Sequence, residues 1–134
     1  MNLIKQATGA LGLLGLAVAV TSRSRSRAPR TVTVTWSVRV PPSTPDDEPL
    51  YLTGNLPALG PWNPKGLQLH RIRPDAYIAK LQIPPATGLE YKFTRGSWET
   101  VEATENGQDR PNRNLLVSGP EQVFASVDAW ADRV

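Results

Sequence analysis

The chain of 134 residues contains no cysteine and a single histidine. The absence of cysteine excludes disulfide bonds, thiolate metal sites and a cysteine nucleophile. His70, the one histidine, lies in an expected strand, where we interpret it as structural. No set of residues has metal-ligand spacing, no Ser-His-Asp arrangement can be assigned, and Glu99 and Glu102 are expected on opposite faces of a strand. The sequence therefore predicts a protein that is not an enzyme and has no metal or cofactor site.

The chain also has no apolar run as long as a bilayer span. The run from Ala7 to Val20 covers 14 residues, whereas a spanning helix needs about 20. Its length suits a signal peptide, and Ala17-Val18-Ala19 fits a cleavage site. We therefore expect residues 1–20 to be a signal peptide, which makes the protein secreted or periplasmic. An uncleaved membrane anchor through residues 7–20 is the alternative.

Positive charge is concentrated before the expected domain. Residues 1–30 carry five basic side chains and no acid, whereas residues 31–134 carry 10 basic and 12 acidic side chains. The arginines after the apolar run favour the cytoplasmic side and so oppose simple export. We interpret residues 21–30 as an Arg/Ser-rich linker in preference to a nucleic-acid tail, because the stretch is short and lacks aromatics. The mildly acidic remainder predicts no nucleic-acid partner.

The chain contains 13 prolines and 10 glycines, and many of them lie between short alternating apolar runs, which indicates an all-β domain. Residues 31–40 alternate strictly, and Trp36 shares one face with four valines, so we expect it in the core. Seven or eight short strands predict an immunoglobulin-like antiparallel β-sandwich over residues 31–128. The expected strands are residues 31–40, 50–53, 67–72, 76–83, 89–94, 98–103, 114–117 and 122–127.

The stretch from Tyr91 to Trp98 carries the most functional information. Alternation places Tyr91 on the core face of a strand and Lys92 on the outer face. Trp98 follows a Gly96-Ser97 turn and can lie beside the ammonium group of Lys92. An indole next to a hydrogen-bond donor suits a sugar ring, whose C–H face stacks while its hydroxyls bind polar groups. Taken singly, Lys92 fits a solvated strand face and Trp98 fits a cross-strand packing partner.

A series of short motifs runs in a characteristic order along the chain. These motifs are Tyr51-Leu52-Thr53-Gly54-Asn55, Leu59-Gly60-Pro61-Trp62-Asn63-Pro64, Glu90-Tyr91-Lys92-Phe93, Trp98-Glu99 and Asn112-Arg113. The series, which spans about residues 31–118, resembles carbohydrate-binding module family 20, the starch-binding domains, with features of the glycogen-binding family 48. The resemblance implies a noncatalytic module that binds α-glucans. It also implies a sugar site made of Trp62, Lys92, Trp98 and Asn112.

The chain departs from the family pattern around this site. The segment 100–111 is longer than the usual link, which makes Asn106 a rival to Asn112. The second sugar site of family 20 uses several aromatics, of which only Tyr77 falls near a matching position, as a secondary contact. We therefore expect one sugar site. The alternative is a β-sandwich interaction domain or esterase-accessory domain with its tryptophans packed inward and no sugar ligand.

Overall fold

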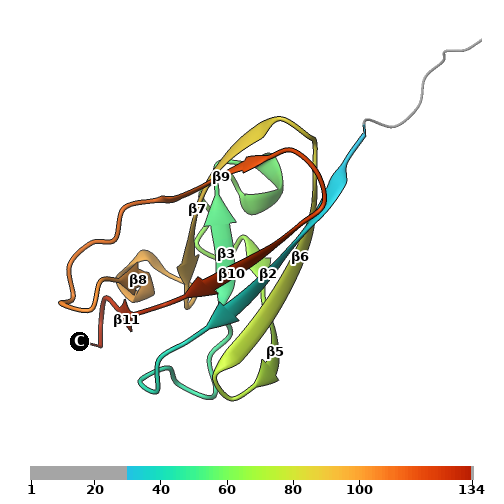
Figure 1. Ribbon diagram of the computed structural model, residues 1–134. Helices are drawn as coiled ribbons and strands as arrows, with labels where there is room; N and C mark the ends of the chain where they lie inside the picture. Colours follow the sequence, from blue (N-terminus) through green and yellow to red (C-terminus); the bar gives the residue numbers. More distant parts are fainter. Residues whose placement is uncertain (1–29, 134) are drawn as a thin grey trace, which may run out of the picture. The chain divides into compact units, whose positions relative to one another are not determined.

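Two four-stranded sheets face each other in the structure, a computed structural model that describes residues 30–133 (Figure 1). One sheet has the strand order β10-β2-β6-β5 and the other β4-β3-β7-β9, and a short pair, β8 and β11, lies beside them. The predicted all-β sandwich is confirmed, with eight strands in its two sheets. The strands are β2 (Val32–Arg39), β3 (Tyr51–Gly54), β4 (Leu67–Gln68), β5 (His70–Arg73), β6 (Ala76–Ile83), β7 (Thr87–Thr94), β8 (Glu102–Ala103), β9 (Arg113–Val117), β10 (Glu121–Ser126) and β11 (Ala129–Trp130).

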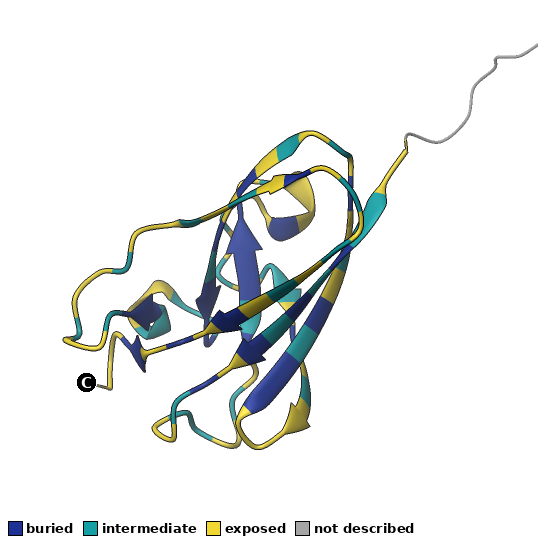
Figure 2. Ribbon diagram, in the orientation of Figure 1, coloured by how far each residue is buried: buried dark blue, intermediate teal, exposed yellow. Residues whose placement is uncertain are grey.

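The alternation in β2 gives this strand one buried and one solvent-facing side. Trp36 is fully buried and forms an edge-to-face contact with Tyr91, at 5.6 Å between ring centroids. Tyr91 in turn contacts Phe93 in the same way, at 5.8 Å. These rings come from opposite sheets, so the core prediction for Trp36 is confirmed, and buried positions line the inner side of both sheets (Figure 2).

One strand pair departs from the antiparallel expectation. β10 pairs with β2 in parallel, with Glu121 opposite Val34 and Ser126 opposite Arg39. The reason lies in the connection, because the chain crosses from the β7-β9 sheet to the other sheet between β9 and β10. β10 therefore runs beside β2 in the same direction.

Two segments that were expected as single strands are divided. In residues 67–72, Leu69 turns into the core and donates its N–H to the carbonyl of Leu50, so β4 joins one sheet and β5 the other. In residues 98–103, the first three form a 3₁₀ helix, η2 (Trp98–Thr100), and only Glu102–Ala103 is a strand. Hydrogen bonds between Ser97 and Thr100 close this helical turn locally.

The compact unit begins at Thr31, and its last strand, β11, extends beyond residue 128, where the expected domain ends. Trp130 on β11 is fully buried and donates its indole N–H to the hydroxyl of Thr44 at 2.8 Å. The expected signal peptide or anchor (1–20), and the linker (21–30) apart from Arg30, lie outside the described residues. Within residues 30–133, no helix has the length and hydropathy of a membrane span.

Candidate functional site

Lys92 lies on the outer face of β7, between the sheet and the loop that follows β8. Tyr91 and Phe93 on either side of it point into the core, whereas Glu90 and Lys92 point outward, as predicted. The half-buried Lys92 donates from Nζ to the backbone carbonyl of Arg110. An ammonium group has three N–H donors, so this bond fixes its position and leaves donors for a ligand.

Asn112 comes directly before β9 and lies next to β7. Its amide nitrogen donates to Oε1 of Glu90 at 3.1 Å, and the pairing of Arg113 with Tyr91 brings it alongside Lys92. Asn106, its rival, is exposed in the turn that the Gly107 and Thr104 backbone closes. Of the two asparagines, the structure brings only Asn112 into contact with an outer-face residue of β7.

A backbone hydrogen bond holds Trp62 at the end of β3. Its N–H donates to the carbonyl of Gly54 at 2.7 Å, and its φ of 57° lies in a region that residues other than glycine rarely occupy. Gly54 allows the approach of β7, because a Cβ there would lie 2.4 Å from the carbonyl oxygen of Glu90. The half-buried indole of Trp62 therefore belongs to a tightly fixed loop beside β7.

Trp98 is the first residue of η2, and its side chain is exposed, with the residue at 44%. The loop that carries it and the loop that carries Trp62 share one anchor. The hydroxyl of Thr94 donates to the carbonyl of Pro64, two residues after Trp62. The same hydroxyl accepts the N–H of Gly96, two residues before Trp98, at 3.1 Å. Alternation along β7 places Thr94 on the outer face with Lys92, and it is buried there because the Trp62 loop covers it.

Tyr77, the expected secondary contact, lies in the core. The residue is only 3% exposed, because its position opposite Val38 of β2 turns it inward. The guanidinium of Arg71 lies 6.0 Å from its ring centroid. A ring buried to this extent is not available for stacking on a sugar, so the expected secondary contact at Tyr77 is wrong.

Glu102 carries a fully buried carboxylate. The sequence suggested it only as a weak catalytic candidate and did not predict its structural role. Its Oε2 accepts the backbone N–H of Phe93 at 3.0 Å, and its Oε1 accepts from Nη2 of Arg113 at 2.8 Å. Nε of Arg110 lies 3.5 Å from the same Oε1. The one signal in the sequence was its place between the apolar residues Val101 and Ala103.

A second ion-pair cluster, in which the arginine is buried and the carboxylates are partly exposed, joins the loop after β2 to the segment after β11. Arg95 pairs with Asp132 and with Glu48, and its guanidinium lies 5.6 Å from the ring of Trp130. Its hydrogen bond to Asp132 lowers the pKa of that carboxyl group below its ordinary value, while burial acts in the opposite direction. This pair holds Trp130 in place.

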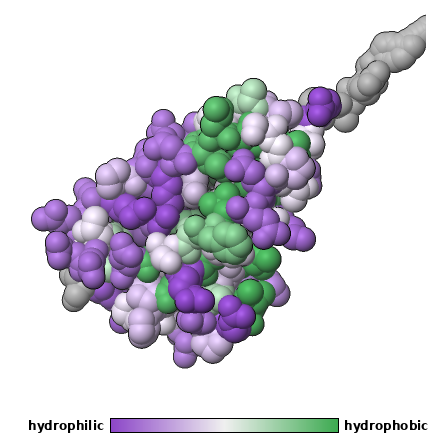
Figure 3. Space-filling model, viewed as in Figure 1, coloured by the Kyte–Doolittle hydropathy of each residue, from purple (hydrophilic) through white to green (hydrophobic). Residues whose placement is uncertain are grey.

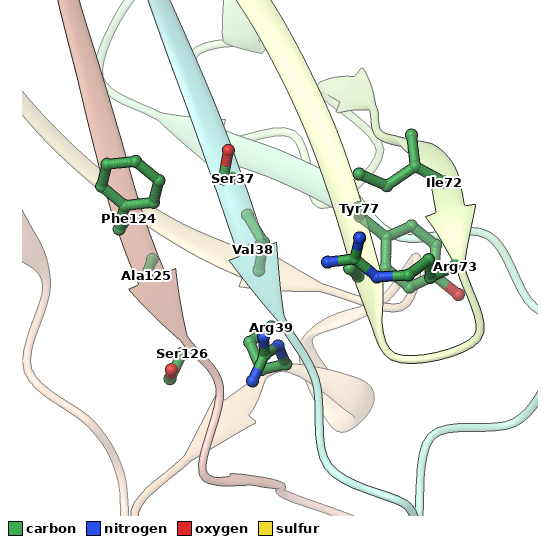
Figure 4. A pocket seen from close by; sticks show the side chains of 10 residues that line it. Ser37, Val38, Arg39, Ile72, Arg73, Tyr77, Phe124, Ala125 and Ser126 are labelled. Carbon is green, nitrogen blue, oxygen red and sulfur yellow. The ribbon is translucent and has the colours of Figure 1, made fainter.

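A shallow groove of about 370 Å³ lies on the outer face of the other sheet (Figure 4). Phe124 on β10, 77% exposed, and Ile72 on β5 stand on its two sides, with Arg39 and Arg73 near its end. In the space-filling view, hydrophobic side chains gather over the strands of this face and hydrophilic ones surround them (Figure 3). Apart from Tyr77, the groove contacts none of the predicted site residues.

Within residues 30–133, no three side chains of the kinds that bind metals come together. The candidate site instead combines indoles in fixed loops with an ammonium and an amide group on one sheet. A β-sandwich of this make-up is a ligand-binding module, with the ligand taken by side chains at the edge of a rigid scaffold.

The comparison with protein families identifies the module. Residues 31–125 match the family described as the starch binding domain, and the chain belongs to that family. It is 40% identical over 106 residues to an alpha-amylase from Niallia circulans, which covers 78% of this chain and 8% of the amylase. It is 35% identical over 105 residues to an amylopullulanase from Thermoanaerobacter thermohydrosulfuricus, which covers 75% of this chain and 7% of that enzyme. The chain thus spans less than a tenth of these relatives.

Solved structures share the fold. A glucoamylase from Hypocrea jecorina superposes with a TM-score of 0.60 at 21% identity, over 84% of this chain and 19% of the enzyme. The family 20 carbohydrate-binding module of a maltotetraose-forming amylase from Pseudomonas saccharophila STB07 superposes with a TM-score of 0.54 at 16% identity. That match covers 71% of this chain and 99% of the module. At these identities the likeness establishes the fold.

Proposed function

We propose that this domain binds α-glucan chains without catalysis, through Trp62, Lys92, Trp98 and Asn112. The observation that carries the proposal is the division of the four tryptophans. Trp36 and Trp130 are fully buried, whereas Trp98 is exposed and Trp62 is held half-buried in a strained loop. Backbone strain of this kind costs about 1–3 kcal/mol and often marks a binding site. Family membership supplies the substrate class.

Each group has a defined part in binding. The indoles of Trp62 and Trp98 stack against the C–H faces of glucose units, which contributes about 1 kcal/mol per ring beyond buried area. Lys92 and Asn112 bond to sugar hydroxyls, and each bond adds about 1 kcal/mol because water competes. The lost freedom of the glucan opposes these gains. We therefore expect a Kd from about micromolar to millimolar.

Trp62→Ala and Trp98→Ala test the assignment of the indoles. Each variant should bind insoluble starch and β-cyclodextrin at least about tenfold more weakly, a loss of about 1.4 kcal/mol. Phe124→Ala is the matched control, because it removes an exposed aromatic ring from the other sheet. Wild-type retention of both tryptophan variants on starch, with all three proteins folded, would refute the site.

Intrinsic fluorescence provides a second readout of the same site. Trp36 and Trp130 are shielded from solvent, so a change in emission on adding maltoheptaose should come from Trp62 and Trp98. The change should shrink in each single variant and vanish in the double variant. A module with no sugar ligand would give no change in any of the proteins.

We also propose that residues 1–20 direct the domain out of the cytoplasm or anchor it in the membrane, on the grounds of the apolar run and the Ala17-Val18-Ala19 motif. N-terminal sequencing of the protein recovered from each cell fraction separates the two. Soluble protein beginning near residue 20 supports cleavage and export. An intact N-terminus in the membrane fraction supports an anchor, and an intact N-terminus in the cytoplasm contradicts both.

A further inference from the structure

Strand β7 loses its partner β9 after Tyr91, one residue before Lys92, and at Phe93 the side chain of Glu102 takes the place of the missing strand. β9 pairs with β7 as far as Tyr91, which lies opposite Arg113. In the same register Phe93 would face Pro111, which has no N–H to give to a ladder, and the chain leaves β7 there. The N–H of Phe93 donates instead to Oε2 of Glu102 at 3.0 Å.

The same carboxylate holds both ends of the segment that leaves β7. Arg113 donates to it from Nη2 at 2.8 Å and from Nε at 3.0 Å, and Nε of Arg110 lies 3.5 Å away. Arg113 also donates to the carbonyl of Ser126 and lies over the ring of Phe93, 5.1 Å from its centroid. Glu102 is completely buried, so its carboxylate is bound by these protein groups and is shielded from water.

The segment that Glu102 holds supplies two contacts of the sugar site. The carbonyl of Arg110 accepts the bond from Lys92 Nζ, and Asn112 lies between the two arginines and contacts Glu90. A shift of residues 110–113 would therefore move the ammonium group and the amide group together.

We propose that Glu102 is a positioning residue for α-glucan binding: from inside the sandwich it fixes the segment that sets the places of Lys92 and Asn112. The inference rests on the proposed function, and it adds a group that does not touch the sugar. A purely structural ion pair would change stability alone, whereas a positioning residue changes the affinity of the folded protein as well.

Glu102→Gln tests this role, because the amide keeps the shape and an acceptor for Phe93 but removes the charge that binds two arginines. We expect the Kd for β-cyclodextrin, measured by calorimetry well below the unfolding temperature, to rise about tenfold. Asp132→Asn is the matched control, since it weakens the ion pair of the other buried arginine, Arg95. The control should lower the unfolding temperature and leave the Kd within about twofold of wild type.

NMR spectra of the same proteins follow the geometry directly. The backbone N–H of Phe93 bonds to a carboxylate, so its proton signal should move upfield in Glu102→Gln. The side-chain amide signals of Asn112 should shift in that variant and stay in place in Asp132→Asn. If wild-type protein binds no glucan, the proposed function fails, and these signals still decide whether Glu102 positions Asn112.

A folded Glu102→Gln protein with wild-type Kd and unshifted Asn112 signals would overturn the proposal. Arg110→Ala covers the case in which Glu102→Gln does not fold, because the Arg110 side chain is 30% exposed and its loss leaves Arg113 paired. Arg110→Ala should raise the Kd about threefold, and an unchanged Kd in that variant would overturn the proposal equally.

Discussion

Two tryptophans of this domain lie in the sandwich and two lie in its loops, and their surroundings in the chain differ accordingly. Trp36 stands in an alternating valine strand and Trp130 on the short strand β11, and both are fully buried. Trp62 lies between two prolines and Trp98 follows a glycine turn. Both side chains are at least partly accessible to solvent and lie in loops beside the sheet that contains β7. The same side chain thus serves packing in one region and, in the proposed site, sugar recognition in the other. Whether a tryptophan is buried or accessible depends on whether a strand or a loop carries it.

Removal of the core indole should have the largest effect. Trp36→Ala deletes a buried ring that packs on Tyr91, and such changes cost about 3–5 kcal/mol of unfolding free energy. Urea unfolding measures the loss, with Trp98→Ala as the exposed counterpart expected to cost less than about 1 kcal/mol. Equal losses of unfolding free energy in the two variants would contradict the distinction between core and loop tryptophans.

Removal of the ammonium group in the loop region should affect binding more than folding. Lys92→Met keeps the apolar stem but loses the bond to the carbonyl of Arg110 and the donors to the sugar. We expect the Kd for β-cyclodextrin to rise about tenfold. Lys80→Met, on the outer face of the other sheet, is the matched control. Similar affinity loss in both variants would indicate a general charge effect.

Acid should weaken the region around Trp130 and spare the loops. The pKa of Asp132 is lower in the folded protein than in the unfolded chain, so its stabilisation is complete above the ordinary aspartate value, about 4, and is lost as the pH falls through the folded value. The Asp132 side chain is 35% exposed, so solvent screening limits the expected loss to about 1 kcal/mol or less.

Unfolding curves for wild type and Asp132→Asn between about pH 6 and pH 3 check this expectation. The wild-type curve should fall more steeply over the acidic part of the range, and the variant should bind glucan as wild type does at each pH. Parallel curves would show that Arg95 and Asp132 contribute no pH dependence.

The backbone of Trp62 allows the smallest and most specific test. Glycine accepts a φ of 57° without strain, whereas alanine does not. Trp62→Gly should therefore be more stable than Trp62→Ala by about 0.5–1 kcal/mol, although both lose the ring and bind glucan equally weakly. Thermal unfolding of the two variants measures the difference, and a less stable glycine variant would contradict the strain.

Local patterns predicted the parts of the molecule that local forces determine. Strict alternation in residues 31–40 was enough to place Trp36 in the core, and alternation around Tyr91 was enough to turn Lys92 outward. Alternation, together with the pairing of β6 with β2, explains why Tyr77 points inward. The pairing itself could not be predicted from the sequence.

Long-range pairings account for what the sequence did not predict. Glu102 and Arg113 are 11 residues apart, and Arg95 and Asp132 are 37 apart, so no motif connects either pair. Trp130 follows the last expected strand, and its burial accompanies the pairing of β11 with β8 and contacts with Thr44 and Arg95, which are distant in the sequence. Alternation and a turn pointed to Lys92 and Trp98, whereas the full set of proposed site residues came from a family resemblance, because no local rule specifies the paths of the loops that carry them.

The hydroxyl of Thr94 bonds to the Trp62 loop on one side and to the turn before Trp98 on the other. Engineers who wish to retarget this scaffold to another polysaccharide should therefore transplant both loops together with their threonine. A graft of one loop alone would leave the other without its support, and the two aromatic rings would no longer keep a common spacing.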